Sequence, residues 1–199
     1  MANKTNSDEK RLQLALALCR LLQAQEYSSI SVHDIAREAG MNHGLIHYYF
    51  GSKDALLIEA IKISSDCQIA LLDDLKQYES ASEMWKKMKQ CMLQFPFDGS
   101  PVENNVSFVV WLSFDAAALS RPNVKELLHQ HYTIKNQLIV QLLTPHVKPG
   151  IDPQYLANTI GQFVLGTIPM FATESVSLST LQASFDLFFD ALSVYLNID

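Results

Sequence analysis

The chain has 199 residues, of which 48% are hydrophobic and 18% charged, and its formal net charge is −6 at pH 7. This composition is typical of a globular protein rather than a disordered chain, and the length allows one or two domains with a sizeable core. Neither an apolar run of membrane-spanning length nor a signal-peptide pattern is present, so we expect a cytoplasmic protein without a membrane partner.

The negative charge is unevenly distributed along the chain. Residues 1–64 hold seven basic and seven acidic residues, whereas residues 65–199 hold eight basic and fourteen acidic ones. An acidic C-terminal part would face away from DNA, and a neutral N-terminal part would bind DNA weakly as a single subunit. Cys19, Cys67 and Cys91 have neither metal-ligand nor redox spacing, and we expect them to be buried free thiols.

The first expected element is a helix that runs to about residue 25, after a polar and mobile stretch at residues 1–9. Its buried stripe has helical spacing and consists of Leu14, Ala17, Leu18 and Leu21. We interpret this helix as a structural support for the elements that follow. Lys4, Lys10 and Arg11 either contact phosphates or are simply solvated.

Two short helices joined by a tight turn are expected at residues 31–50. Ser31 and Asp34 have the spacing of a capping box, so a helix begins there. Gly40 can take the left-handed conformation that ends this helix, and Asn42 is placed to cap the next one. A helix of about eight residues is marginal alone, so its neighbours must hold it. This arrangement is a helix-turn-helix.

The second short helix has two distinct faces. Ile46, Tyr49 and Phe50 point toward the core, whereas His43 and His47, four residues apart, share the opposite face. The histidine face is therefore the one left available to a partner.

A long helix is expected from Ser52 to about residue 78, with Asp54 in its first turn. It belongs to both halves of the chain, so we expect it to transmit movement from one half to the other. Further helices are expected at residues 80–95, 104–119, 122–143, 153–173 and 177–197, with a helix-breaking segment at 95–101. No strand signal is present, so the predicted fold is all-α with about nine helices.

The last two expected helices have more apolar surface than one core requires. The helix at 153–173 is apolar around most of its circumference, and Gly161 and Gly166 would permit another helix to approach closely. The helix at 177–197 has a heptad-like seam that consists of Leu178, Leu181, Phe185, Phe188, Leu192 and Tyr195. We expect these two helices to form a homodimer interface, a four-helix bundle across a two-fold axis.

Two motifs at a fixed offset carry a family resemblance. The run Ile35-Ala36-x-x-Ala39-Gly40-Met41-Asn42 is followed by Tyr48-Tyr49-Phe50-x-Ser52-Lys53-x-x-Leu56-Leu57. Together they resemble the DNA-binding domain of the tetracycline-repressor (TetR) family, over roughly residues 10–62. The resemblance implies a helix-turn-helix DNA-binding domain at residues 1–52 and an effector-binding and dimerisation domain at residues 53–199.

The DNA contacts that we expect lie in or beside the helix-turn-helix. They are Ser31, His33, Asn42, His43, Gly44, His47, Tyr48, Tyr49 and Lys53. By the resemblance, Ser31 and Lys53 contact phosphates, while the second short helix enters the major groove. The family usually has Tyr where this chain has His47, and this difference affects the sequence preference.

Several of these positions allow two interpretations. Asn42 either reads adenine or caps the helix, with capping favoured, so His43 is the better candidate for a base edge. Gly44 lets the helix backbone approach DNA closely. We expect the Tyr48 side chain to point outward and the Tyr49 ring to point toward the core.

The C-terminal part is rich in aromatic residues, which are more often core residues than ligand contacts. They can nevertheless line an effector pocket, and the candidates are Trp85, Phe108, Trp111, Phe114, Asp115, His131, Phe163 and Phe171. The run Trp111-Leu112-x-Phe114 with Ala116-Ala117 and then Pro122 resembles choline-responsive betaine-pathway repressors. An aromatic box near Asp115 would hold a quaternary ammonium by cation–π contact.

No motif supports catalysis, a metal site or another cofactor. The leading hypothesis is a dimeric transcriptional repressor that binds a palindromic double-stranded DNA operator and is released by an unknown small-molecule effector. Two alternatives stay open: a helical binding module with a non-functional helix-turn-helix, and a transcriptional activator.

Overall fold

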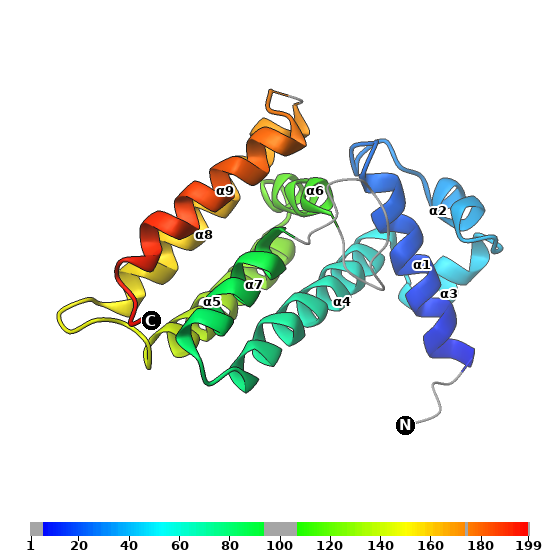
Figure 1. Ribbon diagram of the computed structural model, residues 1–199. Helices are drawn as coiled ribbons and strands as arrows, with labels where there is room; N and C mark the ends of the chain where they lie inside the picture. Colours follow the sequence, from blue (N-terminus) through cyan, green and yellow to red (C-terminus); the bar gives the residue numbers. More distant parts are fainter. Residues whose placement is uncertain (1–5, 94–106, 174, 199) are drawn as a thin grey trace. The chain divides into compact units, whose positions relative to one another are not determined.

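The computed structural model describes residues 6–93, 107–173 and 175–198, and within these ranges it is an all-α protein (Figure 1). Its helices are α1 (Asn6–Leu22), α2 (Val32–Glu38), α3 (Gly44–Phe50), α4 (Lys53–Asp73), the 3₁₀ helix η1 (Asp74–Gln77), α5 (Ala81–Leu93), α6 (Phe108–Ala118), α7 (Pro122–Leu143), α8 (Pro153–Ala172) and α9 (Leu178–Ser193). The predicted fold class is therefore confirmed.

Packing divides the chain into two compact units. Unit 1 combines Met1–Cys67 with Pro101–Leu128, and unit 2 combines Gln68–Ser100 with His129–Asp199. α4 and α7 each begin in unit 1 and end in unit 2, so α4 does belong to both halves of the chain. The functional division expected after residue 52 stays a prediction.

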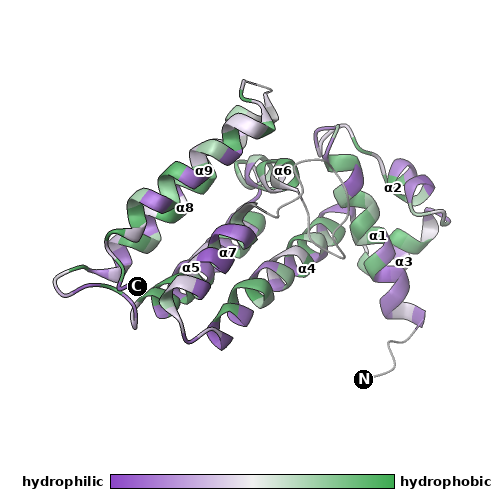
Figure 2. Cartoon of the chain, in the orientation of Figure 1, coloured by the Kyte–Doolittle hydropathy of each residue, from purple (hydrophilic) through white to green (hydrophobic). Residues whose placement is uncertain are grey.

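Unit 1 is built around the apolar face of α1. Leu14 and Leu18 of α1, Ile35 of α2 and Ile46 of α3 are fully buried. α1 packs against α2 and α6, and Figure 2 shows both hydrophobic and hydrophilic positions on these helices. Fully burying such a side chain contributes about 1.5–3 kcal/mol. Burial, rather than its length, therefore stabilises the seven-residue α3.

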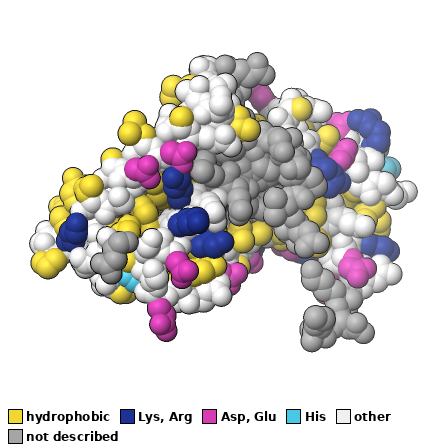
Figure 3. All heavy atoms as spheres, in the orientation of Figure 1, with side chains coloured by type: hydrophobic (Ala, Val, Ile, Leu, Met, Phe, Trp, Pro, Cys, Tyr) yellow, Lys and Arg dark blue, Asp and Glu magenta, His cyan; other side chains and the backbone are white. Residues whose placement is uncertain are grey.

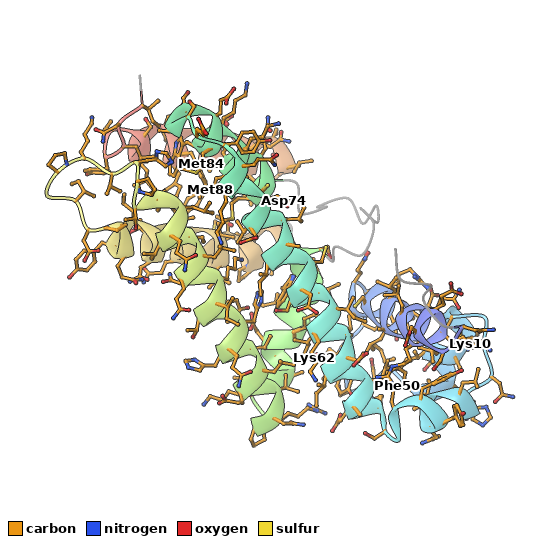
Figure 4. The ribbon with its side chains drawn as sticks, turned by 90° about the horizontal axis from the view of Figure 1, so that it is seen from below. Lys10, Phe50, Lys62, Asp74, Met84 and Met88 are labelled. Atoms are coloured by element: carbon orange, nitrogen blue, oxygen red, sulfur yellow. The ribbon has the colours of Figure 1, made fainter. Side chains whose placement is uncertain are left out.

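Unit 2 has a core to which α5 and α9 contribute large side chains. Met84 and Met88 point from α5 into the interior (Figure 4), where both are fully buried. The Trp85 ring lies 4.9 Å from the Phe189 ring, and its indole Nε1 donates a hydrogen bond to the Phe189 carbonyl oxygen over 3.2 Å. These contacts fix α5 against α9.

The helix boundaries differ from the expected ones at two places. Residues 6–9, expected in a mobile tail, form the first turn of α1, where the carboxylates of Asp8 and Glu9 suit the positive end of the helix dipole. α4 ends at Asp73, and the tighter η1 continues the chain to Gln77. The expected helix-breaking segment lies outside the described residues.

The three cysteines are free thiols but not equally buried. Cys19 is buried, and burial raises the pKa of its thiol to about 12. Cys67 and Cys91 are only half-buried, so the predicted burial is right for one cysteine and only partly right for the others. Among the described residues, no helix combines the length and hydropathy needed to cross a bilayer.

Candidate functional site

The start of α2 is fixed by the predicted capping box. The Ser31 hydroxyl accepts a hydrogen bond from the Asp34 amide over 3.2 Å and donates one to Asp34 Oδ2 over 2.6 Å. The Ser31 amide also donates to Asp34 Oδ2, and these bonds lower the pKa of the Asp34 carboxyl. The Ser31 hydroxyl thus has a role within the protein, and its contact with a phosphate stays a prediction.

The turn between α2 and α3 is a Schellman motif. The Met41 amide donates to the Ala36 carbonyl oxygen over 2.8 Å, and the Gly40 amide donates to that of Arg37 over 3.1 Å. Gly40 has a φ of +65°, which favours glycine, as its predicted role requires. This turn fixes the direction in which the chain enters α3.

The first turn of α3 is capped by the side chain of Asn42. Its Oδ1 accepts a hydrogen bond from the Gly44 amide over 2.8 Å, which agrees with the capping interpretation of Asn42, whereas the N-cap residue of α3, His43, makes no side-chain capping bond. A Cβ atom at Gly44 would lie 3.2 Å from this oxygen and would crowd it. His43 is exposed, and its ring lies 4.2 Å from the ring of His33 on α2.

The outward face of the helix-turn-helix combines imidazole and phenol groups. His47 is exposed and its Nδ1 lies 3.3 Å from the Gly51 carbonyl oxygen, which orients the ring. Tyr48 exposes 79% of its surface, whereas Tyr49 is half-buried, so the predicted directions of these two side chains are confirmed. Such groups can bond to base edges and phosphates.

Arg11 joins α1 to α3 and α4, a role that the sequence did not indicate. Its guanidinium donates to the Tyr49 carbonyl oxygen over 2.8 Å, forms an ion pair with Glu59 at 3.1 Å and lies 4.7 Å from the Phe50 ring centre. Phe50 is labelled in Figure 4, at the end of α3. Simple solvation therefore does not describe Arg11, because its side chain supports the end of α3. Its contact with a phosphate stays a prediction.

Tyr27 and three side chains around it form a second support, which we call the Tyr27 cluster: Tyr27, Lys53, Asp54 and Arg121. The Lys53 ammonium donates to the carbonyl oxygens of Tyr27, at 2.8 Å, and Ile30, at 2.6 Å. The Tyr27 hydroxyl donates to Asp54 Oδ1 over 2.7 Å, and Arg121 Nε approaches the same oxygen at 3.3 Å. Both cations also lie over the Tyr27 ring, at 4.2 Å and 4.7 Å.

Lys53 has a structural role in the Tyr27 cluster. Burial lowers the pKa of Lys53, and the hydrogen bond from Tyr27 is the main reason that the pKa of Asp54 is lowered. Two of the three N–H groups of the ammonium are used on the loop between α1 and α2. The phosphate contact expected for Lys53 stays a prediction, beside this described structural role.

The described residues expected to bind a ligand are divided between the two units. Trp111 and Phe114 lie in unit 1, edge to face at 5.5 Å, and Asp115 follows them on α6. The other described candidates lie in unit 2, where they are Trp85, His131 and Phe163. Trp85 and Phe163 pack on aromatic rings of α9, and His131 is buried beside Tyr132. The side chains of Phe108 and Phe171 lie outside the described residues.

Unit 2 contains a hollow of about 200 Å³ between α5, α7 and α8, which we call the α7–α8 hollow. It is lined by Met92, Tyr132, Lys135, Asn136, Ile139, Ala157, Asn158, Ile160, Gly161, Gln162, Val164 and Leu165. None of the six expected ligand residues whose side chains the structure describes is among them. The described polar residues of this lining include Lys135 and Asn136 on α7 and Asn158 on α8.

Exposed apolar side chains gather on the last two helices. Of the ten exposed large hydrophobic residues of the described chain, five lie on α8 and α9 and two come directly after α9: Tyr155, Leu165, Met170, Leu178, Leu187, Val194 and Tyr195. Figure 3 shows hydrophobic side chains at the surface over α8 and α9. By contrast, Leu181, Phe185 and Phe189 of α9 are buried within the unit. We call the exposed set the α8–α9 face.

These features define a class of protein: a helix-turn-helix regulator with a helical C-terminal part. Residues 16–60 match the family described as bacterial regulatory proteins, tetR family. In the described ranges there is no group of three or more His, Cys, Asp or Glu side chains that could hold a metal ion.

Relatives extend the likeness beyond the helix-turn-helix. The chain is 28% identical over 132 residues to the transcriptional regulator BetI of Stenotrophomonas maltophilia, covering 64% of this chain and 63% of that protein. It is 25% identical to BetI of Rhizobium meliloti, covering 94% of this chain and 89% of the relative. A transcriptional regulator from Saccharomonospora viridis, solved in complex with choline, has the same fold, with a TM-score of 0.73 at 23% identity over 92% of this chain and 96% of that one.

Residues 16–60 are thus similar to the DNA-binding part of TetR-family regulators, and much of the chain is similar to the transcriptional regulator BetI. These relatives are regulators of transcription and not enzymes, in agreement with the sequence, which offered no catalytic motif.

Proposed function

We propose that this protein is a homodimeric, ligand-responsive repressor that binds a palindromic DNA operator through α3. The observation that carries the proposal is the outward face of α3 and its preceding turn, where His43, His47 and Tyr48 are exposed while Ile46 anchors the helix. A helix recognises base edges in the major groove through hydrogen-bond donors and acceptors, and it must be held firmly to do so.

Two subunits are needed because one offers DNA little positive charge. Residues 1–64 are neutral overall, so each subunit neutralises few phosphates. The α8–α9 face supports dimerisation, since its side chains expose apolar surface that a second copy would bury. Two recognition helices would then enter successive major grooves, about 34–36 Å apart.

Control by a small molecule completes the proposal. The dimer would have two conformations that differ in the distance between its two helix-turn-helices. An effector releases the operator only if it binds one of these conformations more tightly than the other. α4 is the element through which such a change would pass, because it begins at the helix-turn-helix and ends in unit 2. The choline found in one structural neighbour supports an effector site in the C-terminal part.

Selection of duplexes from a random-sequence library with the purified full-length protein tests DNA binding. We expect enrichment of a palindrome, and affinity for that duplex should fall about tenfold or more in the His43→Ala variant, because a good base contact contributes about 1–3 kcal/mol. Gln13→Ala, at an exposed position of α1, is the matched control and should bind as the wild type does.

Two results would contradict parts of the proposal. If no duplex is enriched, or if His43→Ala binds unchanged, the helix-turn-helix is non-functional and the protein is a binding module. If a reporter gene placed behind the selected palindrome is stimulated rather than silenced, the protein is an activator.

A further inference from the structure

We infer that His43 takes up a proton when the protein binds its operator, and that His33 is a positioning residue that holds the His43 ring in place for this step. The inference rests on the proposed DNA binding by α3 and adds the chemistry of one contact. It follows from the geometry of the two imidazole rings and from the charges beside them. Operator affinity should therefore rise as the pH falls.

The two imidazole rings come from different helices and lie one over the other. His33 belongs to α2 and His43 stands at the start of α3, and their ring centroids are 4.2 Å apart with the planes inclined by 36°. Both residues are exposed. Stacking uses the faces of the rings, whereas the nitrogen atoms of an imidazole lie at its edge. The stack therefore orients the His43 ring and leaves its hydrogen-bonding edge to DNA.

The backbone on both sides of the stack is fixed. The capping box of Ser31 and Asp34 sets the start of α2, two residues before His33. The Schellman turn with Gly40 then sets the path of the chain toward His43, which makes no side-chain capping bond of its own. The His43 ring is thus positioned before DNA arrives, and a preorganised group loses less freedom on binding.

The charged side chains of α2 are already paired. Asp34 forms an ion pair with Arg37 at 2.6 Å, and Glu38 forms one with Arg20 of α1 at 2.5 Å. Residues 39–50, which make up the turn and α3, contain no Asp or Glu. DNA is therefore the partner that brings new negative charge to the stack.

Other titratable groups lie on the helices beside the stack. α3 carries His47, Tyr48 and Tyr49, and α1, which packs against α2, carries Asp8, Glu9, Lys10, Arg11 and Cys19 besides Arg20. Carboxylate, lysine, arginine and tyrosine side chains ordinarily keep their charge between about pH 6 and 8, and burial raises the pKa of the Cys19 thiol to about 12. Of these groups, His47 is the one that can also titrate in this range.

Binding of DNA favours the charged form of an imidazole that lies against it, because the phosphates are negative. Histidine is the side chain that ordinarily changes its charge between about pH 5 and 8. A proton from the solvent would bind the unprotonated nitrogen of the His43 ring, and the imidazolium that results has two N–H donors. The added donor suits the phosphate oxygens and the acceptors N7 and O6 of guanine.

One proton matters for this DNA-binding part because its charge is balanced. Residues 1–64 hold seven basic and seven acidic side chains, so the proton on His43 changes their net charge from zero to +1. His33 would stay neutral, since two imidazolium rings stacked on each other repel. A neutral aromatic face is, in turn, a favourable neighbour for the charged ring of His43.

Fluorescence anisotropy of the full-length protein, on the palindrome that selection enriches, tests the inference at pH 6 and pH 8 and at constant ionic strength. We expect the palindrome to bind about tenfold more tightly at pH 6. Isothermal titration in two buffers of different ionisation enthalpy should show a net uptake of protons on binding. Circular dichroism at both pH values checks that the protein stays folded.

Variants of the stack assign the proton. His43→Gln keeps a donor and an acceptor but cannot become charged, so its affinity should be the same at both pH values. His33→Ala should weaken binding at pH 6 about tenfold and flatten the pH dependence, whereas His33→Phe, which keeps a ring beneath His43, should restore both. His129→Gln, at an exposed histidine of unit 2, is the control and should behave as the wild type does.

The inference is overturned if the wild type binds equally at both pH values, if His43→Gln keeps the pH dependence, if His47→Gln removes it instead, or if His33→Phe behaves as His33→Ala does. In each of these cases a duplex has been enriched and bound, so the operator proposal stands. A selection that enriches no duplex at either pH would overturn both.

Discussion

His131 is a buried histidine that folding keeps uncharged. It exposes 2% of its surface on α7, and burial, helped by the charge of Lys135, lowers its pKa from 6.5 to about 3. Between these two values the unfolded chain binds a proton that the folded chain does not. Folding stability therefore falls as the pH is lowered through this range.

This difference predicts a pH-dependent stability that a single substitution removes. From pH 7 to pH 5 the free energy of unfolding should fall by about 2 kcal/mol through His131, and His131→Gln should make the profile flatter by that amount. Urea titrations at both pH values measure it. His129→Gln, at an exposed position two residues away, is the control. Parallel profiles for wild type and His131→Gln would contradict the prediction.

Substitution by alanine should change the free energy of unfolding in opposite directions at two glycines. Gly40 has a φ of +65° in the Schellman turn, so Gly40→Ala should lower the free energy of unfolding by about 1 kcal/mol or more. Gly161 lies inside α8, where an added Cβ meets nothing within 4 Å, so Gly161→Ala should raise it by about 0.5–1 kcal/mol. Chemical denaturation measures the free energy of unfolding of both variants. If it changes in the same direction in both, the prediction is wrong.

At the scale of elements, the Tyr27 cluster joins the loop before α2 to the starts of α4 and α7. Tyr27→Phe keeps the ring beneath both cations but removes the hydrogen bond to Asp54, and should lower the free energy of unfolding by about 1 kcal/mol. Thermal or urea unfolding measures this loss. Tyr155→Phe, at a tyrosine that exposes 73% of its surface, should have no effect.

Local patterns were sufficient to predict the helices. The spacing of Ser31 and Asp34 predicted a cap, Pro122 predicted the start of α7, and Gly40 predicted the turn, because each signal acts within one or two helical turns. The outward side of α3 was predicted from the same local periodicity, with Tyr48 exposed.

The supports behind that face could not be predicted in the same way. Arg11 bonds to a carbonyl group 38 residues away, and Arg121 meets a carboxylate 67 residues away, so no local spacing indicates either contact. The ligand candidates were chosen for aromatic character, and aromatic side chains such as Trp85 proved to pack in the core. The lining of the α7–α8 hollow comes from three helices, and no local spacing indicates that these residues lie together.

At the scale of the whole molecule, the α8–α9 face determines whether the protein works as one copy or two. Leu187 exposes 74% of its surface and Val194 exposes 58%, although both belong to a strongly apolar segment. A second copy would bury this surface, and a charge placed within it would then be desolvated without a partner. The proposed dimer is therefore sensitive to a single charged side chain at position 187.

Leu187→Glu should convert the dimer into a folded monomer, since the substituted side chain faces solvent within its own subunit. Sedimentation equilibrium measures the mass, and circular dichroism checks the helices. Operator affinity should fall when the dimer is lost, because the neutral N-terminal part of a single subunit contacts few phosphates. Leu119→Glu, at a leucine that exposes 91% of its surface on unit 1, should leave the mass unchanged. A wild type that sediments as a monomer would refute the proposed dimer, and a Leu187→Glu variant that stays dimeric would place the interface elsewhere.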